Sequence, residues 1–248
     1  AVRLYKLASA QNNFYVAGAQ YELGSLYKEG LGVVKDHKEA YRWYTLSAQK
    51  GYSIAQRALG EMHELGQGVV QDYTEAVRWY TLAAGALPGA MFDLGRMYYD
   101  GKGVAQDYKQ AVRWFTQAAR FNNPEAQRAL GSMYTLGEGV VQDYKEAVRL
   151  YTLSQKLGNP DAPHDLGVMY YNGLGVAQDY TQAVYWFRTA AVRGHIYAQY
   201  SLATMYQDGL GVAQDNVKAY MWMNIAITNG DKDTIKDRDA LAADMTPQ

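Results

Sequence analysis

The chain has 248 residues, 48% of them apolar, no cysteine and a formal net charge of −1 at pH 7. Its 24 lysines and arginines are scattered along the sequence, which argues against nucleic-acid binding because that function needs basic side chains gathered on one surface. The lack of cysteine excludes disulfide bonds and thiolate metal sites, and the lack of any run of 18 apolar residues predicts no membrane-spanning helix.

One segment recurs along the whole chain and is clearest at Gly66–Tyr80, which reads GQGVVQDYTEAVRWY. The aspartate of this segment returns at intervals of 35 or 36 residues. A fixed period of this length predicts a solenoid of stacked helix pairs, in which each repeat packs only on its neighbours. The six aspartates are Asp36, Asp72, Asp107, Asp143, Asp179 and Asp215.

The repeats divide the chain, which we expect to form a single repeat domain over residues 1–248. Ala1–Tyr5 has the same sequence, AVRLY, as Ala147–Tyr151, so we expect the chain to begin in a partial helix (1–12), as a fragment of a longer protein. This uncapped end should expose apolar side chains and allow end-to-end self-association. The last segment (228–248) is rich in charged residues, as expected for a terminal capping helix. The repeats between these ends span about 13–48, 49–84, 85–119, 120–155, 156–191 and 192–227.

Each repeat is predicted to contain two helices. The first carries the pattern Ala-x-x-x-Leu-Gly-x-Met-Tyr, as in Ala90–Tyr98, whose apolar residues share one helical face. A glycine inside a helix costs up to about 1 kcal/mol relative to alanine, so its recurrence predicts close contact between helices. The residues at this position are Gly24, Gly60, Gly95, Gly131, Gly167 and Ala203.

A Gly-x-Gly-Val turn joins the two helices. Its first glycine, such as Gly66, should end the first helix in a left-handed conformation. The aspartate that follows should accept hydrogen bonds from the free N–H groups of the second helix. Glutamate or glutamine three residues later completes the sequence of a capping box, in which that side chain reaches back to the aspartate's own N–H. Asp215 is followed by Lys218 instead, so the last repeat lacks this half of the box.

The second helix carries a tryptophan at one register in five of the six repeats. We expect this large side chain to wedge between neighbouring repeats, and a ladder of sugar-binding platforms is the alternative. The tryptophans are Trp43, Trp79, Trp114, Trp186 and Trp222, with Leu150 in the remaining repeat.

Three registers of the first helix vary between repeats, beginning at Tyr21, Ser25 and Lys28. They are spaced i, i+4 and i+7, so they form one stripe on each first helix. Aromatic residues and arginine, which dominate interface hot spots, are frequent in this stripe. We expect the stripe to contact a protein or peptide partner, and drift on a solvent-exposed face is the alternative. The candidate contacts are Tyr21, Arg57, Phe92, Arg96, Tyr99, Arg128, His164, Tyr171 and Tyr200.

Catalytic and metal-binding patterns are weak in this sequence. Ser-x-x-Lys occurs at Ser25–Lys28 and Ser47–Lys50, but the Ser-Asp-Asn and Lys-Thr-Gly motifs that accompany such a serine in acyl transfer are missing. His63 is followed by a glutamate but not by the second histidine of a zinc-binding helix. The other histidines, His37, His164 and His195, fall in different repeats and cannot be assumed to converge. We therefore predict no enzyme activity, no cofactor and no metal.

The full repeat pattern, from Ala-x-x-x-Leu-Gly through Gly-x-Gly-Val-x-x-Asp to Ala-x-x-Trp-Tyr-x-x-Ala-Ala, resembles the Sel-one-like repeat, a relative of the tetratricopeptide repeat. The resemblance covers essentially the whole chain, and Tyr220–Gln248 is similar to the C-terminal cap of bacterial members. It implies an all-α, right-handed superhelical solenoid of about 13–14 helices in antiparallel pairs. It also implies a non-enzymatic scaffold or adaptor that binds a protein or peptide along the concave groove lined by the first helices.

Two other functions remain open. Some bacterial members of the family bind or hydrolyse β-lactams, so a binder or hydrolase of small cell-wall ligands such as muropeptides is one alternative. Those members have a disulfide bond in each repeat, whereas this chain has no cysteine. A structural array that associates end to end is the second. The habits of the family suggest a bacterial periplasmic or exported protein.

Overall fold

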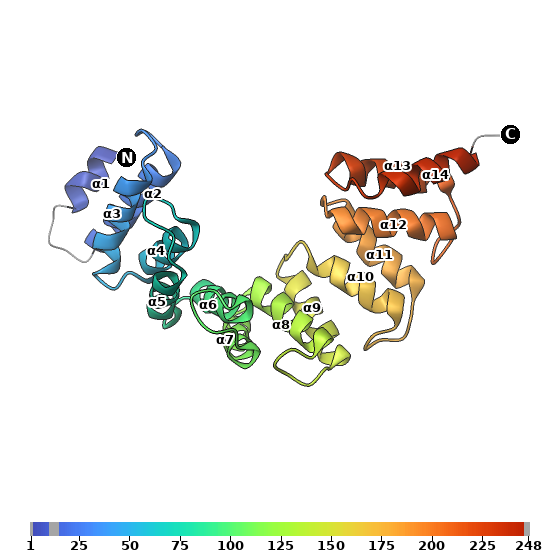
Figure 1. Ribbon diagram of the computed structural model, residues 1–248, viewed down its shortest axis with the longest axis horizontal. Coiled ribbons are helices and arrows are strands. Elements are labelled where there is room, and N and C mark those ends of the chain that lie inside the picture. Colours follow the sequence, from blue (N-terminus) through green and yellow to red (C-terminus); the bar gives the residue numbers. More distant parts are fainter. Residues whose placement is uncertain (1, 10–14, 246–248) are drawn as a thin grey trace. The chain divides into compact units, whose positions relative to one another are not determined.

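The computed structural model describes residues 2–9 and 15–245, and all its regular elements within these ranges are helices (Figure 1). Fourteen helices and no strand are found there, which confirms the all-α prediction and the expected helix number. The predicted N-terminal helix (1–12) is described over Val2–Ser9 as α1. The rest of that prediction, and the last three residues of the predicted cap, lie outside the described residues.

The chain forms two compact units, Ala1–Asn123 and Pro124–Gln248. Within each unit, even-numbered helices are the first helices of the repeats and the odd-numbered helices that follow them are the second. Unit 1 contains α1, α2 (Val16–Glu29), α3 (His37–Ala48), α4 (Ser53–Leu65), α5 (Tyr73–Ala84), α6 (Pro88–Asp100) and α7 (Tyr108–Arg120). Unit 2 contains α8 (Pro124–Leu136), α9 (Tyr144–Lys156), α10 (Ala162–Asn172), α11 (Tyr180–Ala191), α12 (Ile196–Asp208), α13 (Asn216–Thr228) and α14 (Ile235–Met245).

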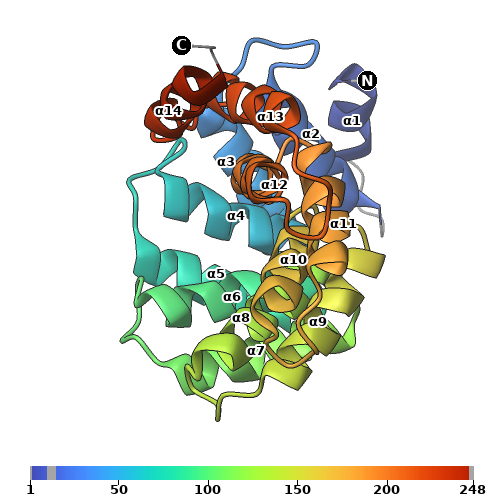
Figure 2. The same cartoon turned by 90° about the vertical axis from the view of Figure 1, so that its right-hand side faces the viewer.

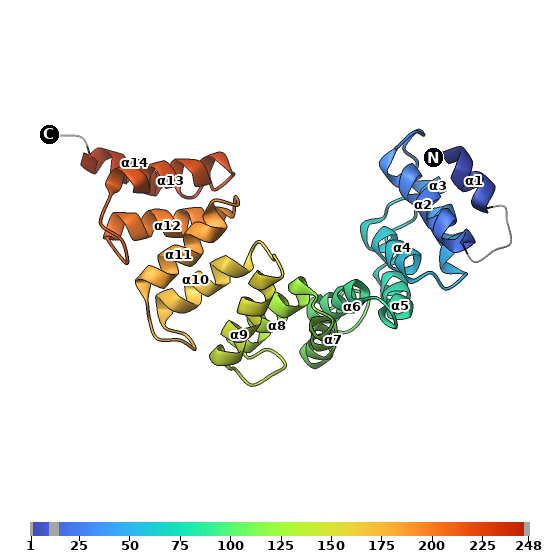
Figure 3. The same ribbon diagram turned by 180° about the vertical axis from the view of Figure 1, so that it is seen from behind.

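Each first helix packs against the second helix of its own repeat and, within a unit, against that of the preceding repeat. Figure 3 shows this order at the start of unit 1, where α1 lies beside α2 and α2 packs on α3. Figure 2 shows it at the end of unit 2, where α13 and α14 lie side by side next to α12. The predicted stacking of helix pairs is therefore present in each unit.

The recurrent glycine of the first helix lies directly against an aromatic ring of the second helix. A Cβ atom added to Gly60 would be 2.5 Å from Cε1 of the buried Tyr80, which is too close for any side chain. The sixth repeat has Ala203 instead, and there the ring is replaced by Met223, whose flexible thioether adapts to the extra methyl group. The prediction of close helix contact is confirmed. The other pairs are Gly24–Tyr44, Gly95–Phe115, Gly131–Tyr151 and Gly167–Phe187.

The Gly-x-Gly turn fits against the preceding repeat. Gly66 ends α4 in the left-handed conformation, with φ 67°, as predicted. Gly68 also has positive φ, and a Cβ atom there would collide with the carbonyl oxygen of His37 at the start of α3. The second glycine is thus needed for its backbone conformation and for the close approach of the turn to the second helix one repeat earlier.

Each of the six repeat aspartates is the N-cap of a second helix. Oδ1 of Asp72, for example, accepts hydrogen bonds from the backbone N–H groups of Thr74 and Glu75 at 2.9 and 3.1 Å. The reciprocal half of the predicted capping box is wrong, because the N–H of Asp72 donates to the carbonyl of His63 in the first helix at 2.9 Å. Glu75 instead lies 3.4 Å from Arg78. The other caps are Asp36, Asp107, Asp143, Asp179 and Asp215.

Two of the repeat tryptophans show the wedge arrangement clearly. The half-buried ring of Trp79 packs on a cluster that contains Tyr44 of the preceding repeat and Leu59 of its own first helix. Trp186 packs in the same way on a cluster that contains Tyr151. These rings therefore serve packing between neighbouring repeats.

The two ends of the chain differ. Leu4 and Leu7 of α1 are 69% and 58% exposed. At the other end α14 buries Leu241 against the core of the last repeat, while its charged side chains remain at the surface. Within the described residues, no helix combines the length and the hydropathy that crossing a bilayer requires.

The caps can be tested at Asp72. We expect Asp72→Ala to lower the free energy of unfolding by about 1 kcal/mol, because two N–H groups of α5 lose their acceptor. Asp72→Asn should retain most of this stability, since the amide oxygen accepts the same bonds. Urea denaturation of the two variants measures the difference. An equal loss in both would show that the carboxylate acts through its charge and not as an acceptor.

Candidate functional site

The nine candidate contact residues lie on the first helices α2, α4, α6, α8, α10 and α12, and each is half-buried or exposed. We call the side of these helices that carries the registers of Tyr21, Ser25 and Lys28 the first-helix face. Most of the candidate side chains on this face already make contacts within the protein. These contacts alternate from one repeat to the next.

In the second, fourth and sixth repeats, the side chain at the register of Tyr21 bonds to an aspartate one repeat further along. The three pairs are Arg57–Asp93 at 2.5 Å, Arg128–Asp165 at 2.5 Å and Tyr200–Asp237 at 2.8 Å. Each pair lies within one unit. The two arginine pairs tie successive first helices together, and Tyr200 ties α12 to the terminal helix α14. The sequence analysis did not identify these three aspartates as hydrogen-bond acceptors. They could have been found from their regular spacing, because Asp93, Asp165 and Asp237 are 72 residues apart, which is two repeat periods.

In the odd-numbered repeats, the same register holds a ring that packs on the second helix of its own repeat. The centroid distances are 5.4 Å for Tyr21–Tyr44, 5.6 Å for Phe92–Phe115 and 5.8 Å for His164–Phe187. Tyr99 and Tyr171, two turns further along the same face, pack on Tyr108 and Tyr180 with ring-centroid distances of 5.3 and 5.4 Å. The aromatic candidates are therefore anchored on one side by the repeat that carries them.

A charged hollow of about 350 Å³ lies between α4 and α6 in unit 1. In its lining, Glu64 accepts a hydrogen bond from the hydroxyl of the buried Tyr80 at 2.8 Å and from Nη2 of Arg96 at 2.7 Å. Asp93 is buried beside them, and burial raises the pKa of its carboxyl although Arg57 counteracts this. Burial and the neighbouring carboxylates also raise the pKa of Tyr80, which keeps its hydroxyl protonated as a donor. The hollow thus brings the candidates Arg57 and Arg96 together.

An uncharged hollow of about 240 Å³ lies between α10 and α12 in unit 2. It brings together the candidates Tyr171 and Tyr200, with Val168, Thr204 and the ring of Phe187 among its other lining residues. The hydroxyl of Tyr200 is held by Asp237, a hydrogen bond to a carboxylate that raises the pKa of the tyrosine to about 12. Its ring is consequently fixed at the edge of the hollow.

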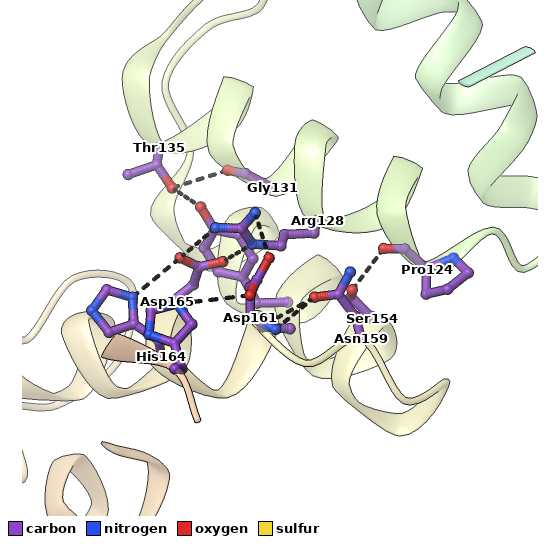
Figure 4. Close-up of polar contacts among 12 residues, drawn as sticks. Pro124, Arg128, Gly131, Thr135, Ser154, Asn159, Asp161, His164 and Asp165 are labelled. Atoms are coloured by element: carbon purple, nitrogen blue, oxygen red, sulfur yellow. Dashed lines mark hydrogen bonds and ion pairs between the residues drawn. The ribbon is translucent and has the colours of Figure 1, made fainter. Parts of the chain in front are cut away.

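A cluster of ionisable groups joins α8, α10 and the start of α12, and Figure 4 shows its centre. Besides Asp165, Arg128 contacts Asp161 at 3.4 Å. The rings of His164 and His195 stack with a centroid distance of 4.5 Å, and their nitrogens lie 3.7 Å from Asp165 and 3.8 Å from Asp161. The sequence offered no basis for assuming that these histidines converge, and the structure brings two of them together across the fifth and sixth repeats.

The serines of both Ser-x-x-Lys motifs hydrogen-bond to the backbone. The hydroxyl of Ser25 donates to a backbone carbonyl of its own helix at 3.2 Å, and Lys28 lies 3.1 Å from Glu61. The hydroxyl of the buried Ser47 donates to a carbonyl of α2 at 2.6 Å. Over residues 2–9 and 15–245, no three histidine, aspartate or glutamate side chains gather in a way that could hold a metal ion.

Removing Arg57 should lower the stability of the protein more than removing the charge of its partner Asp93. Arg57→Ala leaves a buried carboxylate without its partner, so we expect a loss of roughly 2–3 kcal/mol. Asp93→Asn should cost less, because the half-exposed Arg57 can turn to water. The loss in Arg57→Ala should also shrink as the pH falls into the acid range, because burial raises the pKa of Asp93 and the protonated carboxyl no longer buries a charge. Urea denaturation at two pH values measures both effects, and an equal, pH-independent loss would contradict them.

His195 should make unit 2 sensitive to acid. Its Nδ1 accepts a hydrogen bond from the N–H of Ala198 at 3.1 Å and caps α12, so protonation removes the cap. Burial, and secondarily the neighbouring His164, lower the pKa of His195 below its usual 6.5. The unfolded chain therefore binds the proton first, and the stabilisation is complete above about pH 6.5 and is lost as the pH falls toward the folded-state pKa.

We expect His195→Asn, which keeps an acceptor for the cap but does not titrate, to lose less stability than the wild type between about pH 7.5 and about pH 5.5. Urea midpoints at the two pH values measure this. His63, whose pKa is also lowered, remains in both proteins and cancels in the comparison. Parallel losses in the two proteins would show that His195 is not the acid-sensitive group.

Comparison with known proteins identifies the repeat. The family model described as the Sel1 repeat matches residues 17–52, 53–86, 88–120, 124–159, 160–195 and 196–231. No curated protein matches the chain. A solved structure of a Sel1 repeat protein from Oxalobacter formigenes is 32% identical, with a TM-score of 0.82, and the match covers 92% of this chain and 99% of that one.

A protective antigen of uropathogenic Escherichia coli with an SLR fold is 35% identical, with a TM-score of 0.87 over 94% of this chain and 50% of the antigen. This chain therefore spans about half the length of the antigen. An immunity protein from Pseudomonas aeruginosa, 17% identical with a TM-score of 0.57 over 94% of this chain and 90% of that one, shares the fold. The chain belongs to the Sel1 repeat family, whose helical repeats typically serve as non-catalytic scaffolds for protein interaction.

Proposed function

We propose that this chain is a non-enzymatic scaffold that binds a protein or peptide segment through the first-helix face of its units. The observation that carries the proposal is a hollow between successive first helices in each unit, bordered by side chains from the variable registers. Concave sites with a few fixed polar groups are where ligands bind most often. Side chains that repeat unchanged, such as Leu59 and Leu94, are buried in the stack instead.

The contacts already described prepare the face for binding. Arg57 and Arg96 each use one nitrogen in an ion pair and remain 46% and 34% exposed, so their other N–H groups can bind carbonyl oxygens of a partner. Because Asp93 and Glu64 hold these guanidinium groups in place, less side-chain entropy is lost on binding. Arg57, Arg128 and Tyr200 therefore act both in stacking the repeats and in shaping the surface.

The test is a selection of random displayed peptides against the protein, followed by affinity measurements on an enriched peptide. We expect Tyr99→Ala combined with Tyr171→Ala, one change on the first-helix face of each unit, to weaken binding at least about tenfold. The matched control is Arg78→Ala combined with Arg149→Ala, one exposed change per unit on the second helices. Fluorescence anisotropy with a labelled peptide reports affinity, and thermal unfolding shows whether each variant remains folded.

The control should bind as the wild type does. If the control loses affinity and the tyrosine variant does not, the binding surface lies on the second helices. If no peptide is enriched, the proposal that this chain recognises peptides is wrong.

A further inference from the structure

The two hollows occupy equivalent places in different repeats. The charged hollow lies between the second and third repeats and the uncharged hollow between the fifth and sixth. Both have the aromatic ring of the second helix in their lining, Tyr80 in one and Phe187 in the other. The registers of Glu64 and Arg96 in the first hollow are occupied by Tyr171 and Thr204 in the second. The same scaffold therefore forms two sites with different chemistry.

Four polar side chains of the uncharged hollow each use a side-chain donor within the protein. The hydroxyl of Ser201 donates to Tyr197, that of Thr204 donates to Ser201, and the side-chain amide of Asn172 donates to Val168, all to backbone carbonyls of their own helices at 2.8–2.9 Å. Tyr200 donates to Asp237. With these donors bonded, and with the rings of Phe187, Tyr171 and Tyr200 in its lining, the hollow presents mainly carbon surface to a ligand.

The remaining lining is suited to an aromatic ring. Phe187, Tyr171 and Tyr200 supply rings and Met205 supplies a thioether, and both groups make favourable edge and offset contacts with aromatic side chains. Its volume of about 240 Å³ exceeds the roughly 150 Å³ of an apolar cavity that admits benzene. A charged side chain would lose hydration there without gaining an oppositely charged partner among the lining residues.

We propose that the hollow between α10 and α12 is the subsite for an aromatic side chain of the bound peptide, whereas the hollow between α4 and α6 is not. This inference rests on the proposed function, because it assigns the chemistry that one part of the same surface selects. Peptides enriched on the protein should share an aromatic residue at one position. Replacing that residue with alanine should weaken binding about tenfold.

The decisive variant introduces the charged pair of the unit 1 hollow into the uncharged hollow of unit 2. Tyr171→Glu with Thr204→Arg reproduces, at equivalent registers, the Glu64–Arg96 pair that the charged hollow accommodates. We expect this variant to bind the selected peptide about tenfold more weakly, and to bind its alanine form as well as the wild type does. The matched control is Thr181→Glu with Tyr185→Arg, the same two charges on the exposed side of α11. It should bind both peptides as the wild type does.

A second variant tests the same hollow without added charge, so that the test does not depend on whether the charged variant folds. Thr204→Leu fills the hollow with carbon and should exclude the aromatic side chain without adding charge. Circular dichroism confirms that each variant is folded, and anisotropy gives the affinities. The proposal is overturned if neither hollow variant affects the selected peptide, or if both lower the affinity of the alanine peptide equally. Enriched peptides without a shared aromatic residue overturn this inference alone, while failure to enrich any peptide overturns the proposed function with it.

Discussion

The contact between a helix backbone and an aromatic ring sets the geometry of every repeat but the last. Because Gly60 has no side chain, the ring of Tyr80 reaches the backbone of the first helix and fixes the distance between the two helices. The exception follows the same logic, since Ala203 is paired with Met223 and not with a rigid ring. The ring also borders the hollow that opens on the first-helix face. One packing constraint thus connects the spacing of the helices to the shape of the surface that we propose binds a partner.

The second constraint acts between repeats and has a period of two. Arg57 and Arg128 neutralise Asp93 and Asp165, which are buried or nearly so, and such carboxylates are costly without a partner. The first-helix face is therefore not a set of independent positions on which any residue is tolerated. Part of its variation between repeats has a structural cause. At the register of Tyr21, a side chain that bonds to an aspartate one repeat further along alternates with a ring that packs on the second helix of its own repeat. Sequence variability among repeats is consequently an incomplete guide to which residues are free for recognition.

Features that depend on short stretches of sequence could be predicted, and those that depend on distant groups could not. The helices, the left-handed Gly66 and the aspartate caps follow from local backbone chemistry. Half of the capping box failed because a carbonyl of the preceding helix, that of His63, takes the N–H of Asp72. The stacking of His164 on His195 depends on how a turn folds back over the neighbouring repeat, which no single repeat encodes. The aspartates that accept the forward bonds do recur regularly in the sequence, but at twice the period of the repeat motif.

Side chains of the first-helix face also take part in contacts that hold the stack together. The glycine and ring pair borders the hollow in both units, and lining residues at the variable registers, Glu64 and Arg96 among them, make one hollow charged. Glu64 also accepts the hydrogen bond of the buried Tyr80 hydroxyl, so a change there affects the contact between the helices. The forward bonds act in the same way, because a change at Arg57 also affects a buried carboxylate. A change in the chemistry of the charged hollow at the registers of Tyr21 and Lys28 should therefore also lower stability.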